Sequence, residues 1–368
     1  MSKEKINIYP FDKEFLDILR NSSKFKENYE INKLISPRGW GYCGKDAGMI
    51  DYGEVLGLTV ESSFEGNLDE CDTVIFTKPN KEVDYEEIIK NKIDLAIEKN
   101  KNIICLLDLE DEEINRIRKK CNKKNLRFEI YNNYYNYSEI DDTWEKLYKI
   151  NIPVIFVMGL SEELNKFGLE LFLKEKFLKN GYKASVIGSR SYSRFLEDNA
   201  IPSFMFENYI PEHKKILLFN EFVKNIENKE EPDVIIIGVP GSVLPISANH
   251  PNKFGVLAFE ISRAVVPDTT VLCINYNRFN KEYFEQLTML LKYRFSADIG
   301  CFYVNNTILD FMNEDLEGGV SLINVNYDSV KEEVEKAQSL GISIYSSMEY
   351  VYKKVESILS GYADISLV

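Results

Sequence analysis

The sequence lacks long apolar runs and any excess of basic residues. The longest apolar runs, such as residues 154–160, fall far short of the ~20 residues that a membrane-spanning helix needs. Lysine and arginine total 45 against 59 aspartates and glutamates, which gives a net charge of −14. A chain with this balance and no clustered basic stretch repels nucleic-acid phosphates on average. We therefore expect a protein that binds neither membranes nor nucleic acids.

Patterns typical of metal sites and disulfides are also missing. The six cysteines are widely spaced, none lies in a Cys-x-x-Cys motif, and there are only two histidines. Zinc sites need clustered ligands of these types, so we expect no metal centre. The charged N-terminus resembles no secretory signal, which predicts a cytoplasmic protein with reduced thiols. Most cysteines are expected in the core, and Cys43 is the exception because it lies in a glycine-rich segment.

Short apolar segments alternate with helical patterns along most of the chain. We expect buried strands over 73–77, 102–107, 154–158 and 234–237, and helices over 85–98, 112–124 and 164–179. Continuous apolar strands separated by helices are typical of parallel sheets covered on both faces. The fold class is therefore α/β, with two doubly wound parallel-sheet domains. We expect a Rossmann-like domain over 1–130, a connector over 131–150 and a degenerate P-loop-like domain over 151–368.

The first candidate site is a glycine-rich loop, SPRGWGYCGKDAG, over residues 36–48. It follows an expected strand, and ligands bind open parallel sheets at the carboxyl ends of strands. Arginine and lysine side chains there suit an anion, the tryptophan suits stacking, and the cysteine suits thiol or acyl-transfer chemistry. The candidates for ligand or partner binding are Arg38, Gly39, Trp40, Gly41, Cys43, Gly44, Lys45 and Asp46. The alternative is a structural loop that closes the sheet.

The second candidate is a phosphate-binding loop between a buried strand ending at Gly159 and a helix beginning near Lys166. In such loops a phosphate rests on the helix N-terminus beside a lysine. Asn165 replaces the usual glycine before the lysine, and Phe167 replaces the hydroxyl that ligates Mg²⁺. Acidic residues at 162–163 add charge that repels phosphate. We therefore predict a degenerate loop, and an ordinary β–α connection with a chance lysine remains the alternative.

The third candidate is a second strand-end loop, after residues 234–237. The nucleotide- or anion-binding candidates from the second and third segments are Gly159, Ser161, Asn165, Lys166, Phe167, Gly238, Gly241 and Ser242. Ser242 has no nucleophile-elbow context, and no orienting carboxylate is placed for a pair with His250, which disfavours a hydrolase.

Two arginines, Arg190 and Arg194, follow another expected strand. They suit a phosphate or carboxylate, although pairing with the neighbouring acids Glu197 and Asp198 is favoured.

Together these segments resemble the clostridial peptide maturation system family. The resemblance lies in IYPFD, LISPRGWGYCGKDAG, VIFVMG, IGSRSYS, IIIGVPG and KFGVLAFEIS. Members are encoded near radical SAM maturases and small cysteine-rich precursors of natural products such as bacteriocins. The resemblance implies an accessory protein in the maturation of a ribosomally made peptide. Its implied partners are the precursor peptide, an acyl-carrier-like protein or the maturase, with a homo-oligomer as a further option.

The second half also resembles the dethiobiotin-synthetase-like branch of P-loop proteins. Gly159 stands seven residues before Lys166, as in that branch, and Gly238, Gly241 and Pro245 fit its second loop. Ile237 stands where the branch has a glutamate. This resemblance implies an alternative function, an ATP-dependent ligase or kinase-like enzyme that activates a carboxylate. Because the hydroxyl, the glycine and the carboxylate are all replaced, no cofactor is assigned, and ATP with Mg²⁺ stays the alternative ligand.

Overall fold

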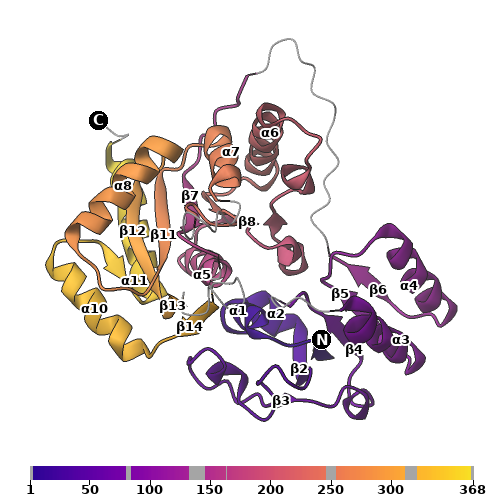
Figure 1. The fold of residues 1–368 in the computed structure, drawn as a ribbon. Helices are drawn as coiled ribbons and strands as arrows, with labels where there is room; N and C mark the ends of the chain where they lie inside the picture. The colour runs from indigo at the N-terminus through magenta and orange to yellow at the C-terminus, as the bar shows by residue number, and fades with distance from the viewer. Residues whose placement is uncertain are drawn as a thin grey trace. The chain divides into compact units, whose positions relative to one another are not determined.

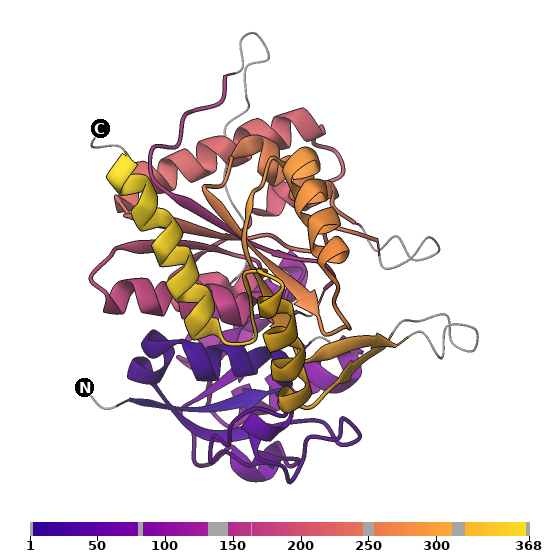
Figure 2. The same ribbon diagram turned by 90° about the vertical axis from the view of Figure 1, so that its left-hand side faces the viewer.

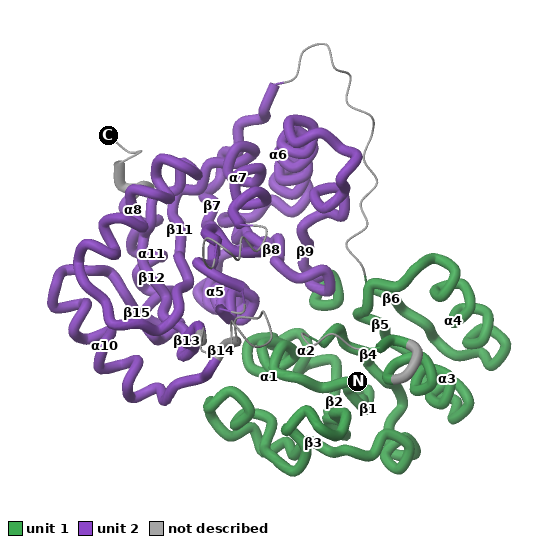
Figure 3. Tube along the Cα trace, in the orientation of Figure 1, with its two compact units in different colours: residues 1–133, 194–197 green, residues 134–193, 198–368 purple. Residues whose placement is uncertain are grey.

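The structure is a computed structural model that describes residues 3–79, 84–131, 146–162, 164–245, 254–310 and 321–365. It is an α/β protein with two large parallel sheets flanked by helices, as predicted (Figures 1 and 2). The chain forms two compact units (Figure 3). Unit 1 comprises residues 1–133 and 194–197, and unit 2 comprises residues 134–193 and 198–368. Most of the expected connector lies outside the described residues.

Unit 1 is built on a six-stranded parallel sheet in the order β3-β2-β1-β4-β5-β6. Its strands are β1 (Glu4–Tyr9), β2 (Tyr29–Ile35), β3 (Val60–Glu61), β4 (Thr73–Phe76), β5 (Asn102–Cys105) and β6 (Phe128–Ile130). Its α-helices are α1 (Leu16–Asn21), α2 (Ser23–Asn28), α3 (Asn91–Glu98) and α4 (Asp111–Lys123). The expected helix over 85–98 begins as a π-helical segment, Tyr85–Lys90, that continues into α3.

Unit 2 is built on a seven-stranded parallel sheet in the order β15-β12-β11-β7-β10-β8-β9. Its strands are β7 (Val154–Gly159), β8 (Ala184–Gly188), β9 (Asn199–Ala200), β10 (Val234–Gly238), β11 (Thr269–Asn275), β12 (Ile299–Asn305) and β15 (Ile344–Tyr345). Two further strands, β13 (Thr307–Asp310) and β14 (Ser321–Asn324), form an antiparallel pair. Its α-helices are α5 (Lys166–Lys179), α6 (Glu212–Glu230), α7 (Val256–Ala264), α8 (Lys281–Phe295), α10 (Tyr327–Ser339) and α11 (Met348–Ile365).

The two faces of the unit 2 sheet pack against different helices. Phe156 and Ile237 belong to a core cluster that includes residues of α6, α7 and α8. Ile155 and Ile236 belong to a second cluster, with residues of α5 and α11, and α11 packs beside α5 (Figure 2). Because successive side chains of a strand alternate between faces, position 238 faces α5 and position 237 faces away from it. This alternation decides which residue at the end of β10 can meet α5.

The cysteines lie as predicted. Five of them are buried, and Cys43 is half-buried. Burial raises the pKa of the Cys273 and Cys105 thiols, which leaves both as inert thiols at neutral pH.

Candidate functional site

The phosphate-loop segment of the sequence lies at the switch point of the unit 2 sheet. β7 is the central strand, with β10 on one side and β11 on the other. Ligands of open α/β sheets bind where the strand order reverses, outside the carboxyl ends of the strands. The loop between β7 and α5 starts from that edge, and α5 begins at Lys166. The topology therefore puts this segment where a ligand site is expected.

Asn165 adopts a left-handed backbone conformation, with φ 54° and ψ 33°. This region favours glycine, and asparagine is among the side chains that tolerate it best. Although position 165, directly before Lys166, is not a glycine, its backbone adopts the conformation that a glycine would adopt easily. Gly159, at the start of the loop, cannot carry a side chain, because an added Cβ would lie 2.7 Å from the Ser161 carbonyl oxygen. The loop is thus tightly folded at both ends.

Lys166 is buried at the first turn of α5, and its side chain passes over the end of β7. The side chain lies so close to Gly159 that an added Cβ there would be 3.1 Å from its Nζ. Nζ donates a hydrogen bond to the carbonyl oxygen of Gly241, in the loop after β10. Burial, with a smaller contribution from the charge of Arg190, lowers the pKa of Lys166 to about 8, and Cys273 and Glu170 oppose this shift. An ammonium group has three donors, and the described residues accept from one of them.

Glu170 lies one turn along α5 and is completely buried. Its Oε2 accepts the backbone N–H of Ser189, at the end of β8, at 3.0 Å. Its Oε1 has no hydrogen-bond partner among the described residues. Burial raises the pKa of this carboxyl to about 7, against the smaller effects of the Ser189 hydrogen bonds and of Lys166. A Cβ added to Gly238 would lie 2.0 Å from Oε1, so the carboxyl group packs directly on the end of β10.

A polar network fixes the start of the loop. The Ser161 hydroxyl donates to Oδ1 of Asn275 at 2.7 Å, and Asn275 is the last residue of β11. The Asn275 amide donates in turn to the Thr307 hydroxyl at 3.1 Å. Because these groups are buried and paired, their hydrogen bonds hold the start of the loop against β11.

The structure brings together all eight anion-binding candidates of the second and third segments. Two of them serve packing: Phe167 makes an edge-to-face contact with Tyr192, and Ser242 is buried with its carbonyl accepting from Gly255. His250 and Glu163 lie outside the described residues.

The two arginines of the next segment belong to different units. Arg190 acts electrostatically on Lys166 and Glu170, whereas Arg194 belongs to the part of the chain grouped with unit 1. Asp198 does not depend on them, since it pairs with Lys174 of α5.

Sequence reasoning missed Glu170, Ser189 and Asn275. A glutamate in an apolar helix resembles an exposed position, and only its spacing of four residues from Lys166 could have indicated a shared helix face.

The glycine-rich loop over 36–48 follows β2 in unit 1. Gly39, Gly41 and Gly44 have φ between 80° and 91°, which requires glycine. Asp46 accepts the backbone N–H groups of Gly48, Leu56 and Leu58 at 2.8 to 3.0 Å, with the Leu56 bond contributing most to holding its pKa below the usual range.

Other residues of this loop also make internal contacts. The Cys43 thiol donates to the Ser36 carbonyl at 3.4 Å, and Trp40 contacts Tyr42 edge to face. Arg38 and Lys45 are exposed. Asp46 ties the loop to Leu56 and Leu58, and Cys43 bonds to its first residue, so these contacts support the structural interpretation of the segment.

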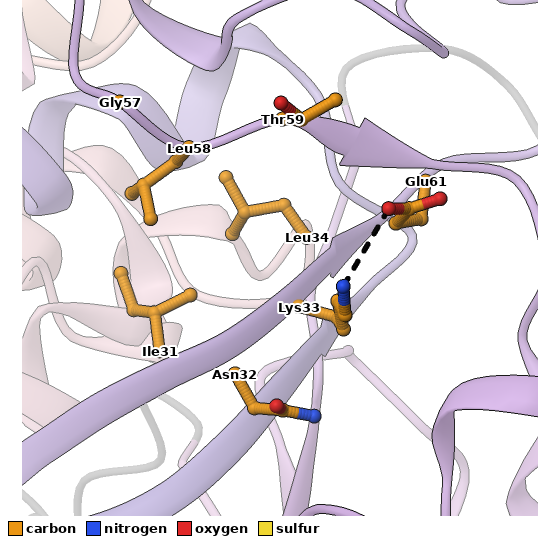
Figure 4. A pocket seen from close by; sticks show the side chains of 8 residues that line it. All are labelled: Ile31, Asn32, Lys33, Leu34, Gly57, Leu58, Thr59 and Glu61. Carbon is orange, nitrogen blue, oxygen red and sulfur yellow. Dashed lines mark ion pairs between the residues drawn. The ribbon is translucent and has the colours of Figure 1, made fainter.

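A cavity in unit 1 lies between β2 and the segment leading into β3 (Figure 4). Its lining residues are Ile31, Asn32, Lys33, Leu34, Gly57, Leu58, Thr59 and Glu61. Lys33 and Glu61 form an ion pair across the cavity at 3.6 Å, so the two charged side chains that line it neutralise each other. In the described parts of the chain there is no cluster of three potential metal ligands, and no helix is long and apolar enough to cross a membrane.

Comparisons with known proteins bear on the fold. No family model matches the sequence, and no curated protein matches it. A DUF1611 family protein from Anabaena variabilis superposes with a TM-score of 0.62 at 12% identity, over 96% of this chain and 100% of that chain. A homoserine dehydrogenase from Staphylococcus aureus matches 35% of this chain and 33% of its own at 12% identity, with a TM-score of 0.26. The receptor FtsY from Elizabethkingia anophelis matches 42% of this chain and 51% of its own at 15% identity, with a TM-score of 0.28. The chain therefore shares the fold of the Anabaena protein over nearly its whole length.

Proposed function

We propose that unit 2 binds a phosphate-bearing ligand at the switch point of its sheet. The observation that carries this proposal is Lys166, a buried amine at the N-terminus of α5 with only one acceptor among the described residues. A buried cation is costly unless it is paired and hydrogen-bonded, and a phosphate supplies both the charge and the acceptors. The N–H groups at the start of α5 favour the same anion.

A second observation points to the same place. The Oε1 atom of Glu170 is buried without a partner, one turn from Lys166 on the same helix. Buried polar atoms in native proteins nearly always have a partner, so an orphan atom next to a buried amine indicates a site for a polar ligand. The loop after β10 contributes Gly241, which lets the chain turn with φ 76° beside the Lys166 amine.

We further propose that the protein is an accessory factor in the cytoplasmic maturation of a ribosomally made peptide. This role rests on the resemblance of several sequence segments to the clostridial peptide maturation system family. The partners would be the precursor peptide, an acyl-carrier-like protein or a radical SAM maturase. A pull-down with the neighbouring maturase and precursor tests the role, and recovery of neither partner would count heavily against it.

Calorimetric titration with ADP tests the ligand site. We expect micromolar binding by the wild type, and loss of binding in Lys166→Met, because the substitution keeps an apolar side chain of similar length but removes the charge. Lys179→Met is the matched control, since Lys179 is exposed at the other end of α5. Equal binding by wild type and Lys166→Met would refute the site.

The second candidate function is an ATP-dependent ligase or kinase-like enzyme that activates a carboxylate. Glu170 favours it, because a carboxyl group with a pKa near neutrality suits proton transfer. Incubation with ATP, Mg²⁺ and the precursor peptide tests this alternative. Peptide-dependent release of ADP or AMP that Lys166→Met abolishes would support it over a purely accessory role.

A further inference from the structure

The phosphate site of unit 2 lacks the side chains that hold Mg²⁺ in the P-loop motif. Phe167 stands at the hydroxyl position and packs on Tyr192. Ile237 stands at the carboxylate position of the resembled branch, and its side chain joins the core on the face away from α5. Mg²⁺ in phosphate sites is held by one or two such oxygen ligands together with the phosphates and waters. These residue types leave the usual ligand positions of the cation without an oxygen.

The carboxyl group that does reach this part of the sheet comes from α5. Glu170 packs on Gly238, the residue at the end of β10 that faces the helix. It is completely buried, with Oε2 bonded to the Ser189 amide. A carboxylate so enclosed cannot gather the waters that complete the octahedral shell of Mg²⁺. Its position instead puts an ionisable group beneath the start of α5, where its charge acts on Lys166 and on any bound anion.

We propose that this site takes its phosphate-bearing ligand without a divalent cation and with uptake of protons, Lys166 binding as ammonium and Glu170 as the neutral acid. The inference rests on the proposed function and deepens it. It commits the site to phosphate esters that bind metal-free, and it makes their affinity fall as the pH rises.

The charged groups around Lys166 and Glu170 decide whether the affinity for the ligand rises or falls with pH. Lys166 faces Cys273 of β11, Arg190 after β8, and the acids Glu170 and Glu162. Glu170 faces Ser189, Lys166 and Arg190. In the ligand-free protein, burial sets the Lys166 pKa at about 8 and the Glu170 pKa at about 7, so both groups lose protons between neutral and mildly alkaline pH.

A bound phosphate dianion raises both pKa values, because it attracts the ammonium and repels the carboxylate. Protons therefore enter on binding above about pH 7, and linkage requires that the affinity fall by about tenfold per proton for each pH unit. The phosphate itself adds little to this dependence above pH 7, since its second pKa is about 6.

The experiment is calorimetric titration of the full chain with ADP from pH 7 to 9.5, in EDTA and separately in Mg²⁺. Runs in two buffers with different ionisation enthalpies count the protons taken up. We expect binding in EDTA that Mg²⁺ does not strengthen, because Mg²⁺ complexes ADP and lowers the concentration of the metal-free ligand. We also expect an affinity about tenfold lower at pH 8 than at pH 7, and proton uptake at pH 8. A requirement for Mg²⁺, or an affinity that does not change over this range, would overturn the inference and leave the proposed function standing.

The Glu170→Gln variant distinguishes the proton taken up by Glu170 from the proton taken up by Lys166. The amide is neutral at every pH, so the variant should bind ADP about tenfold more tightly than the wild type at pH 8 and equally at pH 6. It should keep the fall in affinity above pH 8 that comes from Lys166. Glu175→Gln, on the same helix, is the control and should follow the wild type. A Glu170→Gln variant with the wild-type pH profile would refute the role of Glu170, and absence of ADP binding under every condition would overturn the proposed function together with the inference.

Discussion

Replacement of Gly238 by alanine tests the geometry on which the site is built. Gly238 has no positive φ, so alanine suits its backbone, and the three atoms nearest to an added Cβ all belong to the Glu170 carboxyl group. An added Cβ would lie 2.0 Å from Oε1, 2.1 Å from Cδ and 2.4 Å from Oε2. The carboxyl group is completely buried and bonded to Ser189, so it cannot move away cheaply. Overpacking of this kind costs about 1–3 kcal/mol of unfolding free energy.

A double-mutant cycle isolates this contact. Glu170→Ala removes the carboxyl group, and in that background Gly238→Ala should be neutral or stabilising by up to about 1 kcal/mol, because alanine restricts the unfolded chain. The coupling free energy between the two substitutions should therefore be about 2 kcal/mol, measured by urea unfolding of the four proteins. A coupling below about 0.5 kcal/mol would mean that the carboxyl group does not lie against the end of β10.

Substitutions at three further positions give independent tests. Asn165→Val should lower the unfolding free energy by about 1–2 kcal/mol because its φ is 54°, whereas Asn165→Gly should stay within about 1 kcal/mol of the wild type, both by urea unfolding. Phe219→Ala should cost about 3–5 kcal/mol, since the ring is completely buried in the α6 core, and its urea midpoint will show it. Burial raises the pKa of Asp198 to about 6, so the folded state holds more protons than the unfolded state between pH 4 and 6. The contribution of Asp198 to the free energy of unfolding falls as the pH rises through that window. Relative to Asp198→Asn, the wild type should lose up to about 3 kcal/mol of unfolding free energy from pH 4 to 6.

These tests have clear failures. Equal stabilities of Asn165→Val and Asn165→Gly would show that residue 165 is not left-handed. An unchanged urea midpoint in Phe219→Ala would show that the Phe219 ring is not buried in the core. A constant stability difference between wild type and Asp198→Asn from pH 4 to 6 would show that the carboxyl group titrates as an exposed one.

The strands were predictable because their signal is local. Continuous apolar runs such as 73–76 and 234–237 indicate strands buried on both faces, and alternation with helices indicates parallel sheets. The phosphate-loop segment was equally accessible, since Gly159 and Lys166 keep a fixed spacing along the chain. Each of these predictions depends on neighbours in sequence.

The rest of the site depends on contacts between distant segments. β10 inserts between β7 and β8, an order that no local pattern encodes. Only that strand order lets Glu170 of α5 contact both Gly238 and Ser189. The face of β10 that meets α5 follows from the sheet register, which shows position 238 there and Ile237 in the opposite core. The burial of Lys166 and its hydrogen bond to the Gly241 carbonyl also depend on the distant loop after β10, which no local pattern places there.

The distribution of the cysteines makes the native chain ready for site-specific labelling. Five thiols are enclosed in the two cores, and Cys43 alone is half-exposed, in the glycine-rich loop of unit 1. A maleimide dye or spin label added to the unmodified protein should therefore attach at one position, without removal of the other thiols. A probe at Cys43 would report on unit 1 while the ligand is titrated into unit 2, and so would reveal whether one half of the chain responds to the other.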